Sequence, residues 1–407
     1  LNPSGEIMAE ESGKIDQETS GDDPTQAELL EGSDSLTQRL NSSVDEGVAS
    51  EVLEDPSTLK NWDASPLPFE FTGKAKEFFG IWFSNLLLSI LTLGIYSAWA
   101  KVRRRRFFLG HTLIGGHRFD YHADPKVILK GRAIVVSVLV VMSLVSELST
   151  VLSGTSLVLL MLALPWLANR SLRFNARMTS FRNVRFDFSG TYGKSLLAFV
   201  LFPLLGLLSL GLLQPFATRY SGRYLAMNYS YGEAKLESDP QLKRLYKGFF
   251  QAFSIILIPF AVLLGIVAQH DWDLERLVLV PIDGATGWLI DFSPFALIIA
   301  LYLAFFHYRA VARNSILGSL SISGFHQLKS EISGFRLAWI VLSNSFLTLS
   351  SFGLLQPWGA VRRWRYETES LQLIPGGSLD EFIGRIQPAE GVIGSEYTDL
   401  QDIDVGI

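Results

Sequence analysis

The chain of 407 residues contains no cysteine. This absence excludes disulfide bonds, iron–sulfur clusters and thiol catalysis. Charged residues are also scarce, at 18% of the sequence, whereas hydrophobic residues make up 48% and the mean hydropathy is +0.26. Several apolar runs approach the ~20 residues that are needed to cross a lipid bilayer. The composition therefore favours a membrane protein over a soluble one.

Recognisable catalytic motifs are missing as well. The sequence has no P-loop, no dinucleotide-binding glycine fingerprint and no pairing of a nucleophile with a base. His111, His117 and His122, with Asp120 between the last two, have the residue types of a zinc site, but their spacing matches no zinc motif. We interpret these three residues instead as solvent-exposed histidines of a loop. We therefore predict no enzymatic activity, no catalytic residues, no metal site and no cofactor.

Charge is distributed unevenly along the chain. Residues 1–63 hold 16 acidic side chains, 3 basic ones and a single aromatic residue, Trp62, so residues 64–407 carry a net charge of +8. A segment this polar cannot bury enough apolar surface to offset the entropy lost on ordering. We predict a disordered acidic leader at residues 1–65, a membrane domain at 66–375 and an acidic C-terminal tail at 376–407.

Three stretches share one pattern of apolar, aromatic and basic residues. Each contains a glycine that is followed by an aromatic residue five positions later, an arginine twelve positions later and a second aromatic residue thirteen positions later. The three glycines are Gly94, Gly211 and Gly353, and Asn85 and Asn344 precede the first and third by nine residues. Internal repetition of this kind reports on architecture. We predict a pseudo-threefold membrane scaffold with internal repeats at about 69–107, 186–224 and 328–366.

The apolar segments fall into two kinds. Helices at about 132–149, 156–169, 248–268 and 293–307 are predicted to span the membrane. If the three repeat elements also spanned it, basic loops would lie on both sides and violate the positive-inside bias. Elements that enter and leave on the cytoplasmic side remove this conflict. We predict re-entrant elements that break near Ser84-Asn85, Pro203 with Gly206, and Ser343-Asn344, and three ordinary spans remain the alternative.

These segments together predict a polytopic α-helical membrane protein with three repeated apolar elements, four transmembrane helices and short cytoplasmic β segments. Alternating residues mark Phe69-Glu70-Phe71 and Phe186-Asp187-Phe188 as strands. Residues 112–122 are predicted to form a β segment that turns at Gly115-Gly116. Both termini are then expected in the cytoplasm.

Several motifs resemble those of one bacterial family. The stretches 91–103 and 170–177, the third repeat through Tyr366-Glu367 and the ending 402–407 are similar to the YjgN-like inner-membrane proteins, a domain of unknown function. The resemblance covers about residues 66–407. The second repeat departs most, because Phe202 and Pro203 stand where the others have Ser-Asn and Gly222 interrupts its basic cluster. The resemblance implies a multi-pass protein of the bacterial inner membrane and implies no reaction.

The basic cluster of each repeat is the main candidate site. Aromatic rings favour the membrane interface and guanidinium groups match lipid phosphates, so specific binding of anionic headgroups is the functional hypothesis. Anchoring of the topology is the more conservative interpretation. Polar groups at membrane depth are further functional candidates. The headgroup candidates are Trp99, Arg103, Arg104, Arg106, Arg219, Arg223, Trp358, Arg362, Arg363 and Arg365, and the intramembrane polar candidates are Asn85, Glu147 and Asn344.

The predicted function is that of a non-enzymatic, lipid-interacting component of transport or envelope maintenance, with anionic membrane lipids as partners. The alternative is a membrane scaffold that recruits a protein partner through its acidic ends. Nucleic acid is not an expected partner, because the basic groups adjoin membrane segments.

Overall fold

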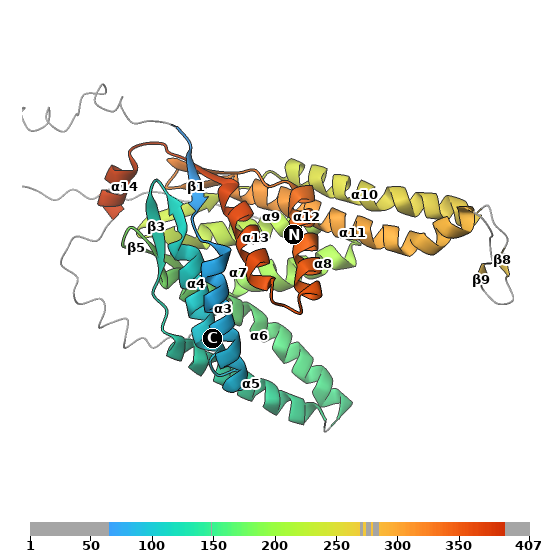
Figure 1. Cartoon of the computed structure of the whole chain (residues 1–407), viewed down its shortest axis with the longest axis horizontal. Helices are drawn as coiled ribbons and strands as arrows, with labels where there is room; N and C mark the ends of the chain where they lie inside the picture. The colour runs from blue at the N-terminus through green and yellow to red at the C-terminus, as the bar shows by residue number, and fades with distance from the viewer. Residues whose placement is uncertain (1–64, 148, 269–271, 274–277, 280–284, 387–407) are drawn as a thin grey trace, which may run out of the picture. The chain divides into compact units, whose positions relative to one another are not determined.

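The computed structural model describes residues 65–147, 149–268, 272–273, 278–279 and 285–386. Residues 1–64 of the predicted leader and 387–407 of the predicted tail lie outside the described residues. Within the described part, short strands alternate with pairs of helices along the whole chain (Figure 1).

Five units of one design follow one another. Each consists of a five-residue strand, two helical arms and a strand of three or four residues, and in the third unit the first arm is made of three successive short helices. The first unit is β1 (Leu67–Phe71), α3 (Ala75–Leu91), α4 (Ser97–Gly110) and β2 (Thr112–Ile114), and the second is β3 (His117–Tyr121), α5 (Pro125–Ser146), α6 (Thr150–Arg177) and β4 (Thr179–Phe181). The third is β5 (Val184–Phe188), α7 (Tyr192–Leu196), the π-helix η2 (Leu197–Leu201), α8 (Phe202–Leu208), α9 (Gln214–Asn228) and β6 (Tyr229–Tyr231). The fourth is β7 (Ala234–Ser238), α10 (Leu242–Ala268), α11 (Ala285–Leu317) and β10 (Leu320–Ile322), with a small pair β8 (Trp272–Asp273) and β9 (Val278–Leu279) between its helices. The fifth is β11 (His326–Ser330), α12 (Gly334–Ser350), α13 (Gln356–Glu369) and β12 (Leu371–Ile374), and it is followed by α14 (Leu379–Ile386).

The strands of the five units form one closed, ten-stranded antiparallel barrel. Each barrel strand pairs with the barrel strands that precede and follow it in the chain. β1 also pairs with β12, with Leu67 opposite Leu373, which joins the first unit to the last. The predicted fold class was therefore wrong: the β segments are parts of a single barrel and not isolated additions to a helical protein. Strands of three to five residues show too few alternating apolar and polar positions to indicate which strands they pair with. In addition, the pairing that closes the barrel joins β1 and β12, which lie at opposite ends of the domain.

Tight turns connect the units. Both residues at the turn between β2 and β3, Gly115 and Gly116, have positive φ (54° and 79°), as do Arg182 and Asn183 between β4 and β5 (49° and 65°). Two successive left-handed residues are typical of the type I′ turn, whose twist matches that of the flanking strands. The β segment predicted to turn at Gly115-Gly116 is confirmed.

The barrel has an apolar core. The central residue of each five-residue strand contributes to it: Phe69, Phe119, Phe186, Leu236 and Leu328. The tail predicted to begin at residue 376 includes α14, which packs Ile383 into the same core, where it is 2% exposed. Side chains therefore fill the barrel.

Four helices are long and apolar enough to cross a membrane: Pro125–Ser146, Val151–Arg177, Leu242–Gly265 and Phe292–Leu317. They are the helix pairs of the second and fourth units. Most of their apolar surface is not buried inside the protein, which is expected where lipid replaces water as the solvent. The prediction of four membrane-length helices is confirmed.

The three predicted repeats are the first, third and fifth units, whose helices are shorter. Their chain reverses at Leu93-Gly94, Leu210-Gly211 and Phe352-Gly353, and not at the predicted midpoints, which lie inside helices. In each reversal the glycine N–H donates to the carbonyl five residues earlier, at 2.7 to 2.8 Å. The apolar residue before the glycine has a φ of 50° to 53° and is at least 92% exposed. Each short unit thus carries an exposed apolar tip.

Candidate functional site

The arginines of the first and fifth units occupy matching positions on α4 and α13. They lie nine, ten and twelve residues after the tip glycine: Arg103, Arg104 and Arg106 on α4, and Arg362, Arg363 and Arg365 on α13. Successive helical residues differ by about 100° in direction, so these three positions face three ways. The structure gives each position its own environment.

The arginines at position nine connect the two helices of their unit. Arg103 donates to Asn85 Oδ1 at 3.4 Å, and Arg362 donates to Asn344 Oδ1 at 3.3 Å. Arg362 also donates to Ser343 Oγ at 2.7 Å and lies over the half-exposed ring of Trp358, 5.2 Å from its centroid. We call this asparagine–arginine pair the clasp. Both asparagines, which were predicted as intramembrane polar candidates, thus have an arginine partner within their own unit.

The third unit replaces the clasp with two aromatic rings. Phe202 and Tyr220 occupy the equivalent positions, nine residues before and after Gly211, and their centroids are 4.4 Å apart. An apolar contact thus stands where the other short units have a polar one. This accounts for the departure of the second repeat from the Ser-Asn pattern.

The arginines at position twelve connect consecutive units. Arg106 donates from Nε to Tyr121 O at 3.0 Å and from Nη2 to Ala123 O at 3.4 Å. Arg365 donates to Gly73 O at 3.0 Å, which links the last unit to the first. In each case the second helix of one unit contacts the chain at or just after the end of the next five-residue strand. We call this contact the latch.

The latch recurs in units whose sequence does not reveal it. Arg173, at the equivalent position of the second unit, donates to Phe188 O at 3.0 Å and to Gly190 O at 3.5 Å. In the fourth unit an asparagine takes this place, and Asn314 bonds both the N–H and the C=O of Ile332 at 2.9 Å. In the sequence, the latch residue of these units is the polar residue six positions before the first residue of the unit's second, shorter strand.

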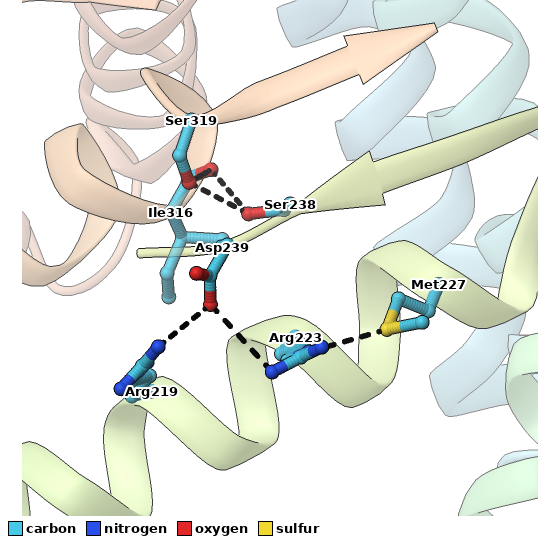
Figure 2. Close-up of polar contacts among 7 residues, drawn as sticks. All are labelled: Arg219, Arg223, Met227, Ser238, Asp239, Ile316 and Ser319. Atoms are coloured by element: carbon cyan, nitrogen blue, oxygen red, sulfur yellow. Dashed lines mark hydrogen bonds and ion pairs between the residues drawn. The ribbon is translucent and has the colours of Figure 1, made fainter. Parts of the chain in front are cut away.

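The third unit forms its latch through an ion pair. Figure 2 shows Asp239, which follows β7, between Arg219 and Arg223 of α9, with Arg219 at 2.9 Å and Arg223 at 3.7 Å from Oδ1. Arg223 Nε also points to Met227 Sδ at 3.4 Å, and Ser238 binds Ser319 Oγ at 2.8 Å beside it (Figure 2). Both headgroup candidates of this unit therefore have a carboxylate partner within the protein.

The arginines at position ten face a common cavity. Arg104 and Arg363 both line a pocket of about 870 Å³ that Glu367 also lines. Arg363 pairs with Glu367 at 2.8 Å, and Arg104 lies over Phe108, 5.8 Å from the ring centroid. We call this cavity the lateral pocket.

The rest of the lateral pocket is largely apolar. Val341, Leu349 and the tip residue Phe352 line it, so it extends along α12 toward the exposed tip of the fifth unit. Gln356 lines it too, and its buried Oε1 has no hydrogen-bond partner among the described residues. A buried acceptor of this kind is rare and calls for a donor. The pocket thus combines two cations, one of which pairs with Glu367, and a largely apolar wall.

Similar known proteins are named as inner membrane proteins. Residues 66–400 match the family described as a bacterial protein of unknown function (DUF898). The chain belongs to this family. It is similar to the inner membrane protein YjgN of Salmonella typhimurium strain LT2, with 27% identity over 340 residues that cover 71% of this chain and 83% of the relative. It is also 33% identical to the inner membrane protein YjgN of Escherichia coli strain K12 over 137 residues, 32% of this chain and 33% of the relative.

No solved structure matches the chain. The named relatives of this DUF898 member and its four membrane-length helices together support an inner-membrane location. The cytoplasmic location of both termini stays a prediction.

The remaining predicted residues lie apart from the lateral pocket. Trp99 is half-buried and stacks on Tyr96, with centroids 6.0 Å apart. Glu147 is exposed at the end of α5. The histidines weighed as zinc ligands have separate neighbours, since His111 Nδ1 lies 2.7 Å from Phe107 O and His122 Nε2 lies 2.7 Å from Ser180 Oγ. Sequence reasoning missed Gln356 as a site residue, although Gln-Pro recurs at this position in the third unit.

Proposed function

We propose that this DUF898 protein is a non-enzymatic membrane component that binds an anionic phospholipid in the lateral pocket. In this proposal the phosphate lies between Arg104 and Arg363, and one acyl chain follows Leu349 toward the tip at Phe352.

The single observation that carries the proposal is the mixed chemistry of the pocket lining. A guanidinium group offers planar donors that match phosphate oxygens, and two guanidinium groups, those of Arg104 and Arg363, line the pocket. Apolar side chains line it as well, and among them is Phe352, which is 99% exposed. A free anion would need no apolar wall, and a plain hydrocarbon would need no cations. An amphiphile uses both.

The arrangement of the units supports a membrane-facing position for this pocket. The second and fourth units carry the membrane-length helices, and the fifth unit belongs to the same ring. No histidine lines the pocket among the described residues, and Glu367 already pairs with Arg363. These features favour binding over catalysis.

The test is native mass spectrometry of the detergent-extracted protein, with phosphatidylglycerol added as the probe. Each basic residue near an anionic surface contributes about 1 kcal/mol, so Arg104→Gln with Arg363→Gln should weaken retention by about 2 kcal/mol, roughly 30-fold. Leu349→Trp should also weaken it, because the larger ring fills the apolar end without changing charge.

Arg118→Gln is the matched control, since it removes an exposed charge outside the pocket. Equal retention by the double variant and this control would refute the proposal. Loss in the double variant with full retention by Leu349→Trp would show that only the headgroup is held, and would refute the acyl-chain part.

A further inference from the structure

A second cavity lies where the five units meet. It measures about 690 Å³, and every unit contributes at least one residue to its wall. Phe119, Phe186 and Leu236 come from the middle of strands β3, β5 and β7, so the barrel core forms one side. We call this cavity the central chamber.

The charged side chains that line the central chamber are all basic. Lys101, Arg104 and Arg105 of α4 line it, and no carboxylate does so among the described residues. Arg105 is held in place, because it donates to Asn175 Oδ1 at 2.7 Å and lies over the Tyr121 ring, 5.4 Å from its centroid. Neither partner neutralises the guanidinium charge.

The environment of Lys101 shows the cost of this arrangement. Burial, and then the positive charges of Arg105 and Arg132, lower the pKa of its ammonium group. Like charges that are withdrawn from water destabilise a fold unless an opposite charge joins them. An anion in the chamber would offset this repulsion.

Most of the remaining wall is apolar. Phe108, Leu109, Leu172 and Trp364 join the three strand residues, while the uncharged polar groups are few. A small inorganic anion would leave this apolar surface facing empty space. An acyl chain with a carboxylate or phosphate group would fill it.

The central chamber and the lateral pocket share part of their lining. Arg104, Phe108 and Trp364 line both cavities. The rings of Phe108 and Trp364 are 4.9 Å apart, and Trp364 Nε1 donates to Thr112 Oγ1 at 3.2 Å, which fixes the indole. The two cavities share these residues but differ in their other charged residues.

We propose that the central chamber is a second binding site, distinct from the lateral pocket, for an amphiphilic anion whose head meets Lys101 and Arg105 and whose chain lies against the barrel core. This site does not depend on the proposed function of the lateral pocket. Each site has a cation that the other lacks, Lys101 here and Arg363 there, which makes the two separable by experiment.

The test is a titration of the full chain, in a non-ionic detergent, with the fluorescent fatty acid cis-parinaric acid. Lys101→Gln should weaken binding by about tenfold, because it removes a charged partner of the head. Leu172→Trp should reduce binding by filling the chamber without changing charge. Lys130→Gln, which removes an exposed lysine from α5, is the matched control. Thermal unfolding of each variant confirms that it is folded.

The pattern of losses decides between the sites. Loss with Lys101→Gln and Leu172→Trp, but not with Arg363→Gln, supports the central chamber. Loss with Arg363→Gln alone would overturn it and leave the lateral pocket as the probe's site. Unchanged binding in all variants, or equal loss in all three, would overturn a distinct central site. Displacement of the probe by millimolar inorganic phosphate would overturn the amphiphilic character of the ligand.

Discussion

Replacing the latch arginines should loosen the ring of units without altering any single unit. Arg106, Arg173 and Arg365 each donate to main-chain carbonyls of the next unit, at 3.0 Å for the shortest contact of each. Glutamine at these positions is too short to reach the same carbonyls and carries no charge. Each substitution therefore removes one connection between two units.

The expected loss follows from the type of bond. A hydrogen bond that involves a charged group contributes about 1.5 to 3 kcal/mol, and Arg106 is partly solvated, so the lower value of about 1.5 kcal/mol applies. The entropy of unfolding is about 2.1 cal/mol/K per residue, or about 0.6 kcal/mol/K for roughly 300 ordered residues, so 1 kcal/mol shifts the unfolding midpoint by about 1.5 °C. Each single variant should therefore lower the midpoint by about 2 °C. The triple variant should lower it by about 7 °C, because each latch joins a different pair of units and distant effects add.

The assay is thermal unfolding in detergent, followed by intrinsic tryptophan fluorescence. Arg118→Gln provides the same change of side chain at an exposed strand position. Arg106→Lys keeps the charge but loses the planar fork, so it should fall between the native protein and Arg106→Gln. If Arg106→Gln unfolds at the same temperature as Arg118→Gln, the latch does not stabilise the ring and the reasoning is wrong.

Two further predictions concern the fifth unit and the barrel. For the clasp, Arg362→Met and Asn344→Leu should each destabilise the protein by about 1 kcal/mol. The double variant should be less destabilised than the sum, since neither side chain of the Asn344–Arg362 contact is then left without its partner. Strict additivity in this double-mutant cycle would contradict the clasp. For the barrel, burial and then the charge of Arg385 lower the pKa of His326 in the folded protein. As the pH falls, His326 is therefore protonated in the unfolded chain at a higher pH than in the folded one, and the free energy of unfolding should decrease below about pH 6.5. His326→Gln should reduce this pH dependence in unfolding curves between pH 5 and 8, and an unchanged slope would show that other groups cause it.

The sequence alone determined the features that depend on local composition and length. Apolar runs long enough for a bilayer identified the four membrane-length helices, because hydropathy and length suffice for that inference. The glycine-centred pattern identified three units, since their tips share one backbone conformation around Gly94, Gly211 and Gly353. Gly115-Gly116 identified a tight turn for the same conformational reason.

The separate roles of the clustered arginines required the folded chain. Arg103, Arg104 and Arg106 look equivalent in the sequence, and all three fit a headgroup site. On a helix with about 3.6 residues per turn they point in different directions. One then meets Asn85, one faces the lateral pocket, and one reaches Tyr121 of the next unit.

Only the tertiary structure decided that the units number five and form a closed ring. The second and fourth units have the same strands and latches as the others, but their helices are lengthened to membrane size and lack the glycine-centred tip pattern. Strands of three to five residues carry no local signal of their partners, and the closing pair of β1 with β12 joins residues from opposite ends of the domain. That pairing depends on the geometry of the whole ring, which no short stretch of sequence specifies.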